Sequence, residues 1–578
     1  MVDRKLIFYD FEVFREDWLV VFIDYDTKKE CVIINDRDRL IKFHNTFKDC
    51  IFVGYNNRSY DDTIFKGILM GKNPFKLTDE LINQGKKQYQ VLPKEHNKIQ
   101  LYSYDTSTGF HSLKQLEAFL GINIEETSVP FDINRKLTDD ELEETINYCR
   151  HDVRSTIMVF EEKKADFDAH VGLIEMFDLD IKYLSKTKAQ LSAVILGAEK
   201  PSEPRNDEWE IELPENLTVN KYKEVVEWFK SEEFSQPKAK LTVDVYGVPH
   251  EFAQGGLHGA TKKKIYDGVI GCWDVSSYYP ATIINYDLIS RNVKDRNKYK
   301  EIRDLRIKYK AEKNPLQASL KLLINSTYGI LNDKYNPMYD PRQAHSICVY
   351  CQLFLLDLIE KIEETCGEHA ELIQSNTDGV YFRFESEEWL EKAQHCVTEW
   401  EQRTGYIMEL DKAKKIIQRD VNNYILITEK GKVKSKGAVV KSLSRIDYDL
   451  PVVNKAMKAY LVDGVRFEDY IANENRLIEY QKVYKLTSNY RCVVHNNQEY
   501  TNKVYRVFAS TREEDTPFFK FKKDKTSPDR FASTPEHTFI DNSDITDKLV
   551  PDYLDKNWYF ERCLSEFKKF TGRDYKGE

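Results

Sequence analysis

The chain has 578 residues and a mass of 68.1 kDa, and 41% of its residues are hydrophobic and 31% charged. This composition excludes wholesale disorder and fits about four globular domains, while ten cysteines are too few for a disulfide scaffold. We expect neither a membrane helix nor a signal peptide, because every apolar run falls short of the roughly 18 residues that a membrane helix needs. Taken alone, the net charge of −10 argues against a general polyanion binder.

The first 160 residues are predicted to be mixed α/β, because short β-branched and aromatic runs come before a long helical pattern. Polar, proline-punctuated sequence follows and is predicted to connect two domains. In chain order, the predictions are strands at 6–11, 18–25 and 51–55, a helix at 142–160, the connection at 201–214 and a strand-rich region at 243–282.

A helical hairpin is predicted next, with helices at 298–313 and 316–331 around a turn at Asn314-Pro315. It is followed by a predicted helix at 344–365 and a strand–turn–strand at 373–384. The pattern after Arg445 is mixed and less readable.

A first set of carboxylates lies near the N-terminus. Alternation along a strand places Asp10 and Glu12 on one face, and Asp61 follows the next predicted strand but one. On the long helix, Tyr148 and Asp152 are four residues apart and share a face. Each pattern alone is common by chance. In this order they indicate two-metal phosphodiester hydrolysis, in which carboxylates hold two cations about 4 Å apart.

These three motifs resemble those of a DEDD-type 3′–5′ proofreading exonuclease, in the variant that carries a tyrosine in its last motif. The resemblance implies that Asp10, Glu12, Asp61 and Asp152 are metal ligands, and that Tyr148 orients the attacking water.

Two further segments resemble elements with which this exonuclease family touches DNA. Residues 112–116 resemble the element that contacts the frayed single strand, which implies DNA contacts from Ser112 and Leu113. A capped start of an amphipathic helix is an equally good interpretation of this segment. In the second motif, Asn57 is a further candidate for a DNA contact.

A second set of carboxylates lies in the middle of the chain. Asp274 follows a predicted strand, and Asp378 lies at the tip of a predicted hairpin. The helix between them places Lys321, Asn325 and Tyr328 on one face. Two aspartates on adjacent strands can bind two Mg²⁺ ions, and a helical lysine can neutralise a triphosphate.

This set resembles family B DNA polymerases: residues 274–280 are similar to motif A (DxxSLYP), 321–329 match motif B (Kx3NSxYG) and 376–378 are similar to motif C (DTD). The resemblance implies that Asp274 and Asp378 are catalytic metal ligands together with the Val275 carbonyl. It implies that Tyr279 is the steric gate against a 2′-hydroxyl and that Lys321 contacts the triphosphate, and it places Asn325 and Tyr328 at the nascent base pair.

The chain departs from the family pattern at several places. Asn376 replaces the first aspartate of motif C, and we still expect activity because Asp378 occupies the essential position. Tyr278 stands where leucine is usual. Residues 422–424 lack the lysine of the KxY element, and 253–256 lack the tyrosine of YxGG. The DNA contacts that these elements imply are Gly255, Gly256, Tyr424, Lys434 and Lys436.

The implied fold class is α/β and multidomain, with an RNase H-like exonuclease followed by a right-hand polymerase of palm, fingers and thumb. The expected layout is exonuclease at 1–165, a connecting region at 166–245, palm at 246–290 and 346–445, fingers at 291–345, and thumb and C-terminal region at 446–578.

The spacing of the motifs suggests a compact enzyme of phage or viral type. Asp274 and Lys321 are 47 positions apart, and Gly329 and Asp378 are 49 apart. Neither interval has room for the inserted subdomains of protein-primed relatives, so we expect a nucleic-acid primer. We further expect two Mg²⁺ per site, with Mn²⁺ able to substitute, and primed DNA template and dNTPs as substrates. We expect a monomer without a membrane partner. The expected location is cytoplasmic, in a bacterial host if the gene is phage-encoded. No motif identifies a helicase, a single-strand-binding protein or another replisome partner.

Three alternatives stay open: a stand-alone 3′–5′ exonuclease with a DNA-binding, polymerase-inactive second half, an inactive replisome scaffold, and an RNA polymerase or primase, which Tyr279 disfavours. The net charge conceals basic clusters, since residues 291–313 contain ten basic and four acidic side chains. Arg306 and Lys310 in that stretch are candidate triphosphate ligands. Cys348 and Cys351 are expected to be core residues rather than a zinc site.

Overall fold

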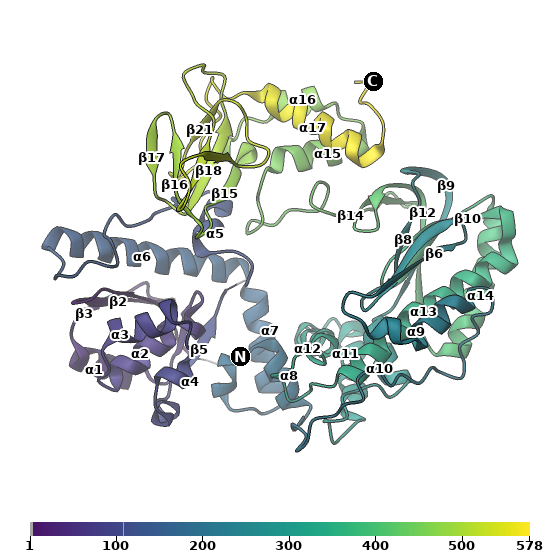
Figure 1. Ribbon diagram of the computed structural model, residues 1–578, viewed down its shortest axis with the longest axis horizontal. Coiled ribbons are helices and arrows are strands. Elements are labelled where there is room, and N and C mark those ends of the chain that lie inside the picture. The colour runs from purple at the N-terminus through teal and green to yellow at the C-terminus, as the bar shows by residue number, and fades with distance from the viewer. Residues whose placement is uncertain (1–3, 108, 578) are drawn as a thin grey trace. The chain divides into compact units, whose positions relative to one another are not determined.

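The computed structural model describes residues 4–107 and 109–577 (Figure 1). It divides into two compact units, and each is assembled from three separate stretches of chain. The first unit comprises Met1–Thr187, Leu443–Val452 and Ile471–Tyr559. The second unit comprises Lys188–Ser442, Val453–Tyr470 and Phe560–Glu578.

The first unit contains a five-stranded sheet with the order β3-β2-β1-β4-β5. Its strands are β1 (Leu6–Val13), β2 (Trp18–Asp24), β3 (Glu30–Ile34), β4 (Ile51–Gly54) and β5 (Tyr102–Asp105). The surrounding helices are α1 (Arg37–Phe47), α2 (Asp61–Leu69), α3 (Pro74–Thr78), α4 (Gln88–Val91), α5 (Leu113–Leu120), α6 (Asp139–Glu162) and α7 (Lys164–Met176). The central strand β1 runs antiparallel to β2 and parallel to β4, and α6 packs against β1 and β2 (Figure 1). The strands and the helix predicted in this region are confirmed.

Two smaller antiparallel sheets, formed by the C-terminal stretch, complete the first unit. The three-stranded sheet orders β15 (Lys482–Lys485), β18 (Val504–Ala509) and β21 (Thr538–Ile540) as β15-β18-β21. The four-stranded sheet orders β16 (Tyr490–His495), β17 (Gln498–Tyr500), β19 (Phe519–Lys522) and β20 (Pro528–Arg530) as β17-β16-β19-β20. Strand β18 packs against α5, so these sheets contact the helix that begins at Leu113.

The second unit is built on a nine-stranded sheet with the order β14-β13-β12-β9-β11-β10-β8-β7-β6. Its strands are β6 (Lys240–Val245), β7 (Val248–Ala253), β8 (His258–Ala260), β9 (Ile265–Val275), β10 (Ala370–Ser375), β11 (Gly379–Phe384), β12 (Met408–Asp420), β13 (Asn423–Thr428) and β14 (Val433–Lys436). Its helices are α8 (Lys188–Ile195), α9 (Lys223–Lys230), α10 (Tyr278–Asn285), α11 (Lys298–Ala311), α12 (Gln317–Ile330), α13 (Pro341–Cys366) and α14 (Glu387–Thr404). Helices α13 and α14 pack on this sheet (Figure 1). Three more helices, α15 (Pro451–Asp463), α16 (Phe467–Asn473) and α17 (Lys556–Thr571), span boundaries between the stretches of the two units.

The hairpin helices α11 and α12, the helix α13 and the strand–turn–strand β10–β11 agree with the sequence prediction. The predicted strand-rich region is wrong at its end, because residues 278–285 form α10. In the part of the chain that the structure describes, no helix is both long enough and apolar enough to cross a membrane.

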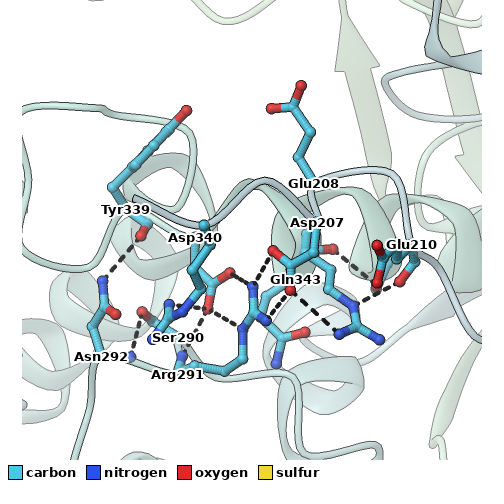
Figure 2. A network of polar contacts seen from close by, with 12 residues as sticks. Asp207, Glu208, Glu210, Ser290, Arg291, Asn292, Tyr339, Asp340 and Gln343 are labelled. Carbon is cyan, nitrogen blue, oxygen red and sulfur yellow. Dashed lines mark hydrogen bonds and ion pairs between the residues drawn. The ribbon is translucent and has the colours of Figure 1, made fainter. Parts of the chain in front are cut away.

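The segment 201–214, predicted to connect two domains, lies wholly inside the second unit. It has no helix or strand, yet it is bound to its surroundings by charge (Figure 2). The guanidinium of Arg291 lies between Asp207 of this segment and Asp340 at the start of α13. We call residues 200–214 the strap.

Candidate functional site

The first candidate site gathers the four predicted carboxylates of the first unit. Asp10 and Glu12 lie on β1, Asp61 begins α2, and Asp152 lies on α6. The backbone N–H of Phe11 donates to Asp61 Oδ1 at 3.2 Å and ties α2 to β1. All four carboxylates are close enough for their charges to interact.

Burial and mutual repulsion raise the pKa values of these carboxyls. Burial is the largest cause for each of them, and it raises the pKa of Asp61 to about 8 and that of Asp152 to about 6. The pKa values of Asp10 and Glu12 rise well above their usual range for the same reason. Hard divalent cations prefer oxygen donors, and a cation would offset this crowding of negative charge, so the donor set fits such an ion.

Tyr148 lies on α6 one turn before Asp152, next to a lysine that the sequence analysis did not single out. The ammonium of Lys114 lies 4.6 Å from the Tyr148 ring centroid and forms an ion pair with Asp152. Lys114 also pairs with Glu117 at 3.2 Å, and His151 Nε2 lies 3.4 Å from the same carboxylate. The segment 112–116 contains Lys114, but its partner Asp152 is 38 positions away, so the sequence carries no local signal of the pair.

The three predicted DNA contacts of this unit differ from one another in their burial and in their hydrogen-bond partners. Ser112 caps α5, and its backbone N–H donates to Gln115 Oε1 at 3.1 Å, as the helix-cap interpretation of the segment expects. Leu113 is half-buried against an apolar cluster. Asn57 is fully buried and donates to Ser103 Oγ at 3.0 Å. A DNA contact from Asn57 stays a prediction, and in this structure its amide does not reach the surface.

The second candidate site lies where β9 and the neighbouring central strand β11 of the nine-stranded sheet meet. Asp274 is near the end of β9, opposite Gly379, and Asp378 lies in the turn between β10 and β11. The Val275 N–H donates to the Asp378 carbonyl at 2.7 Å. Only glycine fits at 379, because a Cβ there would lie 2.2 Å from Asp274 Oδ1. The two predicted aspartates thus lie side by side. Burial, followed by the charge of Asp378, raises the pKa of Asp274 to about 6.

A cavity of 420 Å³ opens beside Asp274 and has walls of opposite charge. Asp274 and Val275 contribute to one wall, and three cations of α11 contribute to the other: Arg303, Arg306 and Lys310. Arg306 also donates to Ser277 Oγ at 3.3 Å. Arg306 and Lys310 were predicted here. Arg303, one helical turn earlier, was missed, although it lies in the same basic stretch.

A second cavity, of 310 Å³, joins the predicted nucleotide-binding residues to Asp378. Its lining includes Tyr279, Lys321, Asn325, Tyr328 and Asp378. The rings of Tyr279 and Tyr328 lie with their centroids 4.2 Å apart. The predicted face of the motif B helix therefore faces the predicted catalytic turn.

The predicted DNA contacts of the second unit have varied surroundings. Gly256 is packed so closely that a Cβ would lie 2.3 Å from Thr377 Oγ1, and the Gly255 carbonyl accepts from Gln352 Nε2 at 2.9 Å. Lys434 pairs with Asp411, whereas Lys436 is exposed.

Tyr424 and the cysteine pair lie in the interior of the second unit. Tyr424 is buried, with its hydroxyl 3.3 Å from that of Tyr381, which in turn donates to Asp274 Oδ1 at 3.3 Å. A DNA contact from Tyr424 stays a prediction, and in this structure its hydroxyl contacts that of Tyr381, the donor to Asp274. Cys348 and Cys351 are buried in α13, which agrees with their prediction as core residues.

Comparisons with known proteins give partial similarity. No protein-family model matches the chain. Over 171 residues the chain is 26% identical to DNA polymerase 1 of Saccharolobus solfataricus, a match that covers 27% of this chain and 19% of that polymerase. The structure of the family B DNA polymerase from the hyperthermophilic archaeon Pyrobaculum calidifontis aligns with 13% identity and a TM-score of 0.40, covering 100% of this chain and 79% of that one. The chain thus has weak sequence similarity to a DNA polymerase, and it is a mixed α/β protein with several sheets.

Proposed function

We propose that the chain is a template-directed DNA polymerase that adds dNTPs to the 3′ end of a nucleic-acid primer and proofreads with a 3′–5′ exonuclease. The observation that carries this proposal is the pairing of Asp274 and Asp378 between two cavities, one lined by Arg303, Arg306 and Lys310 and the other by the motif B residues. A phage or mobile-element genome would be its template, and Mg²⁺ its metal.

Each residue of the second site has a task in this reaction. Asp274, Asp378 and the Val275 carbonyl would hold the metal ions, which supply a polarised 3′-hydroxyl and neutralise charge on the phosphates. The cations of α11 and Lys321 bind the triphosphate and stabilise the charge that moves to the pyrophosphate as the bond to the α-phosphorus breaks. Tyr279, which lines the same cavity as Lys321 and Tyr328, would stack beneath the sugar and exclude a 2′-hydroxyl.

In the proposal, the first site removes nucleotides from the 3′ end by hydrolysis. Asp10, Glu12, Asp61 and Asp152 would hold the metal ions, and the Tyr148 hydroxyl orients the water that attacks the terminal phosphodiester. Lys114 holds Asp152 and lies along the Tyr148 ring, so it positions both groups.

The test uses two variants of the full chain on a primed template with Mg²⁺. Asp378→Ala should abolish nucleotide incorporation and leave 3′ degradation intact, whereas the double variant Asp10→Ala, Glu12→Ala should do the opposite. Incorporation that survives Asp378→Ala would overturn the polymerase assignment.

Asn376 in place of a carboxylate favours one competing function, a stand-alone 3′–5′ exonuclease with a polymerase-inactive second half. That function predicts 3′ degradation by the unaltered chain, with no incorporation at any concentration of dNTPs and Mg²⁺ or Mn²⁺.

A further inference from the structure

The second unit has a cavity outside both candidate sites. It encloses 350 Å³ between the strap and the segment that links α12 to α13. Lys200 and Arg205 line it from the strap, and Lys334 and Tyr339 line it from the linking segment, with Asn292 between them. We call it the strap cavity. None of these residues has a task in the proposed reactions.

A network of ion pairs around the buried Asp340 holds the two walls in place. Asp340 is 1% exposed and accepts from the Arg291 backbone N–H at 2.8 Å and from its Nε at 3.0 Å (Figure 2). The same guanidinium binds Asp207 of the strap, and Arg342 Nη2 lies 3.2 Å from Glu212. Because charge pairs fix the strap at Asp207 in its middle and at Glu212 near its end, the cavity is a built feature of the fold rather than a chance gap.

Asn292 lines this cavity, and one hydrogen-bond acceptor of its side chain is unused. The residue is 6% exposed, and its amide nitrogen donates to the carbonyl of Pro337 at 2.8 Å. The same nitrogen donates to the carbonyl of Tyr339 at 3.0 Å (Figure 2). These two bonds fix the orientation of the amide. Its Oδ1 is buried and has no hydrogen-bond partner. A buried carbonyl oxygen without a donor is costly, so a ligand N–H there would be favoured.

The lining also contains three cationic side chains and one aromatic ring. Within the described residues, neither Lys200 nor Lys334 is joined to a carboxylate, and Arg205 has only the 3.6 Å contact with Asp340, which Arg291 already neutralises. Tyr339 is 37% exposed and is flanked by proline surfaces that line the same cavity. Cations suit phosphates, and an exposed aromatic ring suits a stacked base.

We propose that the strap cavity binds one nucleotide of single-stranded DNA, with its base on Tyr339, an exocyclic amine on Asn292 Oδ1, and its phosphates among Lys200, Arg205 and Lys334. The proposal rests on the proposed polymerase function. A strand is favoured over a free nucleotide because Lys334 lies only four residues beyond α12, the helix that lines the polymerase cavity. Tyr328, which lines that cavity, is six residues before Lys334, and six residues span at most about 21 Å, so a template passing the cavity comes within reach of Lys334.

The test measures binding of primed templates with 5′ single-stranded overhangs by the full chain without divalent metal, with 2-aminopurine at successive overhang positions. In the unaltered chain, fluorescence should change at one position. Lys200→Ala with Lys334→Ala should weaken binding about ten-fold, and should lower the slope of log affinity against log salt by about 1.4, because two phosphate contacts are lost. Tyr339→Ala should remove the fluorescence change and weaken binding about ten-fold, whereas Tyr339→Phe should retain both.

Lys294→Ala is the matched control, because Lys294 is exposed, pairs with Glu199 and does not line the cavity. Cavity variants that bind like this control would overturn the proposal. If dATP binds through the same residues and the overhang adds nothing, the cavity is a free-nucleotide site and the strand assignment is wrong. A chain that binds primed DNA through the cavity but incorporates no nucleotide would refute the polymerase function and leave this inference standing.

Discussion

The turn that presents Asp378 is shaped by the side chain of Asn376. Its side chain is 5% exposed, and its Oδ1 accepts from the backbone N–H of Asp378 at 3.1 Å. Its own N–H donates to the Gly379 carbonyl at 3.0 Å. The side chain thus shapes the turn that presents Asp378, and an aspartate could accept the same bond.

Asn376→Asp should keep the turn and add a negative charge next to Asp378. We expect incorporation to persist. The Mg²⁺ concentration that gives half-maximal incorporation should fall roughly 3- to 10-fold, because the added charge contributes about 1 kcal/mol of attraction. A titration of incorporation rate against Mg²⁺ concentration measures this. Asn376→Ala is the comparison variant. It loses the side-chain hydrogen bond that shapes the turn, so its maximal rate of incorporation should be lower. An unchanged rate in Asn376→Ala would show that the Asn376 bond is dispensable.

The helix α5 depends on a side chain contributed by β18, far along the chain. Arg506 is fully buried and donates to the Ile122 carbonyl at 2.8 Å and to the Ser543 carbonyl at 2.7 Å. It also reaches the carbonyls of Glu117 and Ala118 near the C-terminus of α5. A cation at that end satisfies carbonyls that the helix itself leaves unbonded.

Arg506→Ala should destabilise the first unit by about 3 kcal/mol, because several buried carbonyls would lose their donor. Exonuclease activity should fall with it, since α5 carries Lys114, while incorporation persists. Thermal unfolding and the two activity assays measure this. Arg530→Ala, which removes an exposed arginine paired with Glu536, is the control. Equal effects of the two substitutions would contradict the special role of Arg506.

At the scale of elements, the sequence predicted those helices and strands that a local periodicity of apolar residues encodes. Helices such as α6 and α13 have long amphipathic or apolar repeats, and both were predicted. Residues 278–282 are rich in aromatic and β-branched types and were assigned to a strand-rich region, but tertiary packing makes them the start of α10. The short strands β15–β21 and contacts such as that of Lys114 with Asp152 depend on pairings between distant residues, which no local pattern reveals.

At the scale of the whole molecule, the buried acids of the first site link metal binding, pH and stability. The folded pKa values of Asp61 and Asp152, about 8 and about 6, exceed the value of 3.8 in the unfolded chain. Between these values the folded state holds more protons than the unfolded state, so raising the pH favours unfolding. This contribution to stability is complete below pH 3.8, and it is lost as the pH rises through 6 and 8.

The metal-free first unit should therefore lose thermal stability between pH 5 and pH 8.5, and Asp61→Asn should flatten that dependence. Adding Mg²⁺ at pH 8.5 should restore stability to the unaltered chain, because the cation replaces the protons. Thermal unfolding with a chelator, and then with Mg²⁺, measures both effects. A melting temperature of the metal-free chain that rises across this range would contradict the proton linkage.

The division of the first unit among three stretches of sequence has a consequence for biosynthesis. A ribosome releases Asp10 to Asp152 early, but Arg506 and the strand that carries it emerge only after two of the three stretches of the second unit have been made. Domains generally fold as units during synthesis, N-terminal first. Here the nascent N-terminal stretch, which ends at Thr187, must wait with the end of α5 uncapped until Arg506 is added 319 residues later. We expect a fragment ending at Thr187 to be a poor folding unit, so that degradative activity would not mature ahead of the rest of the chain.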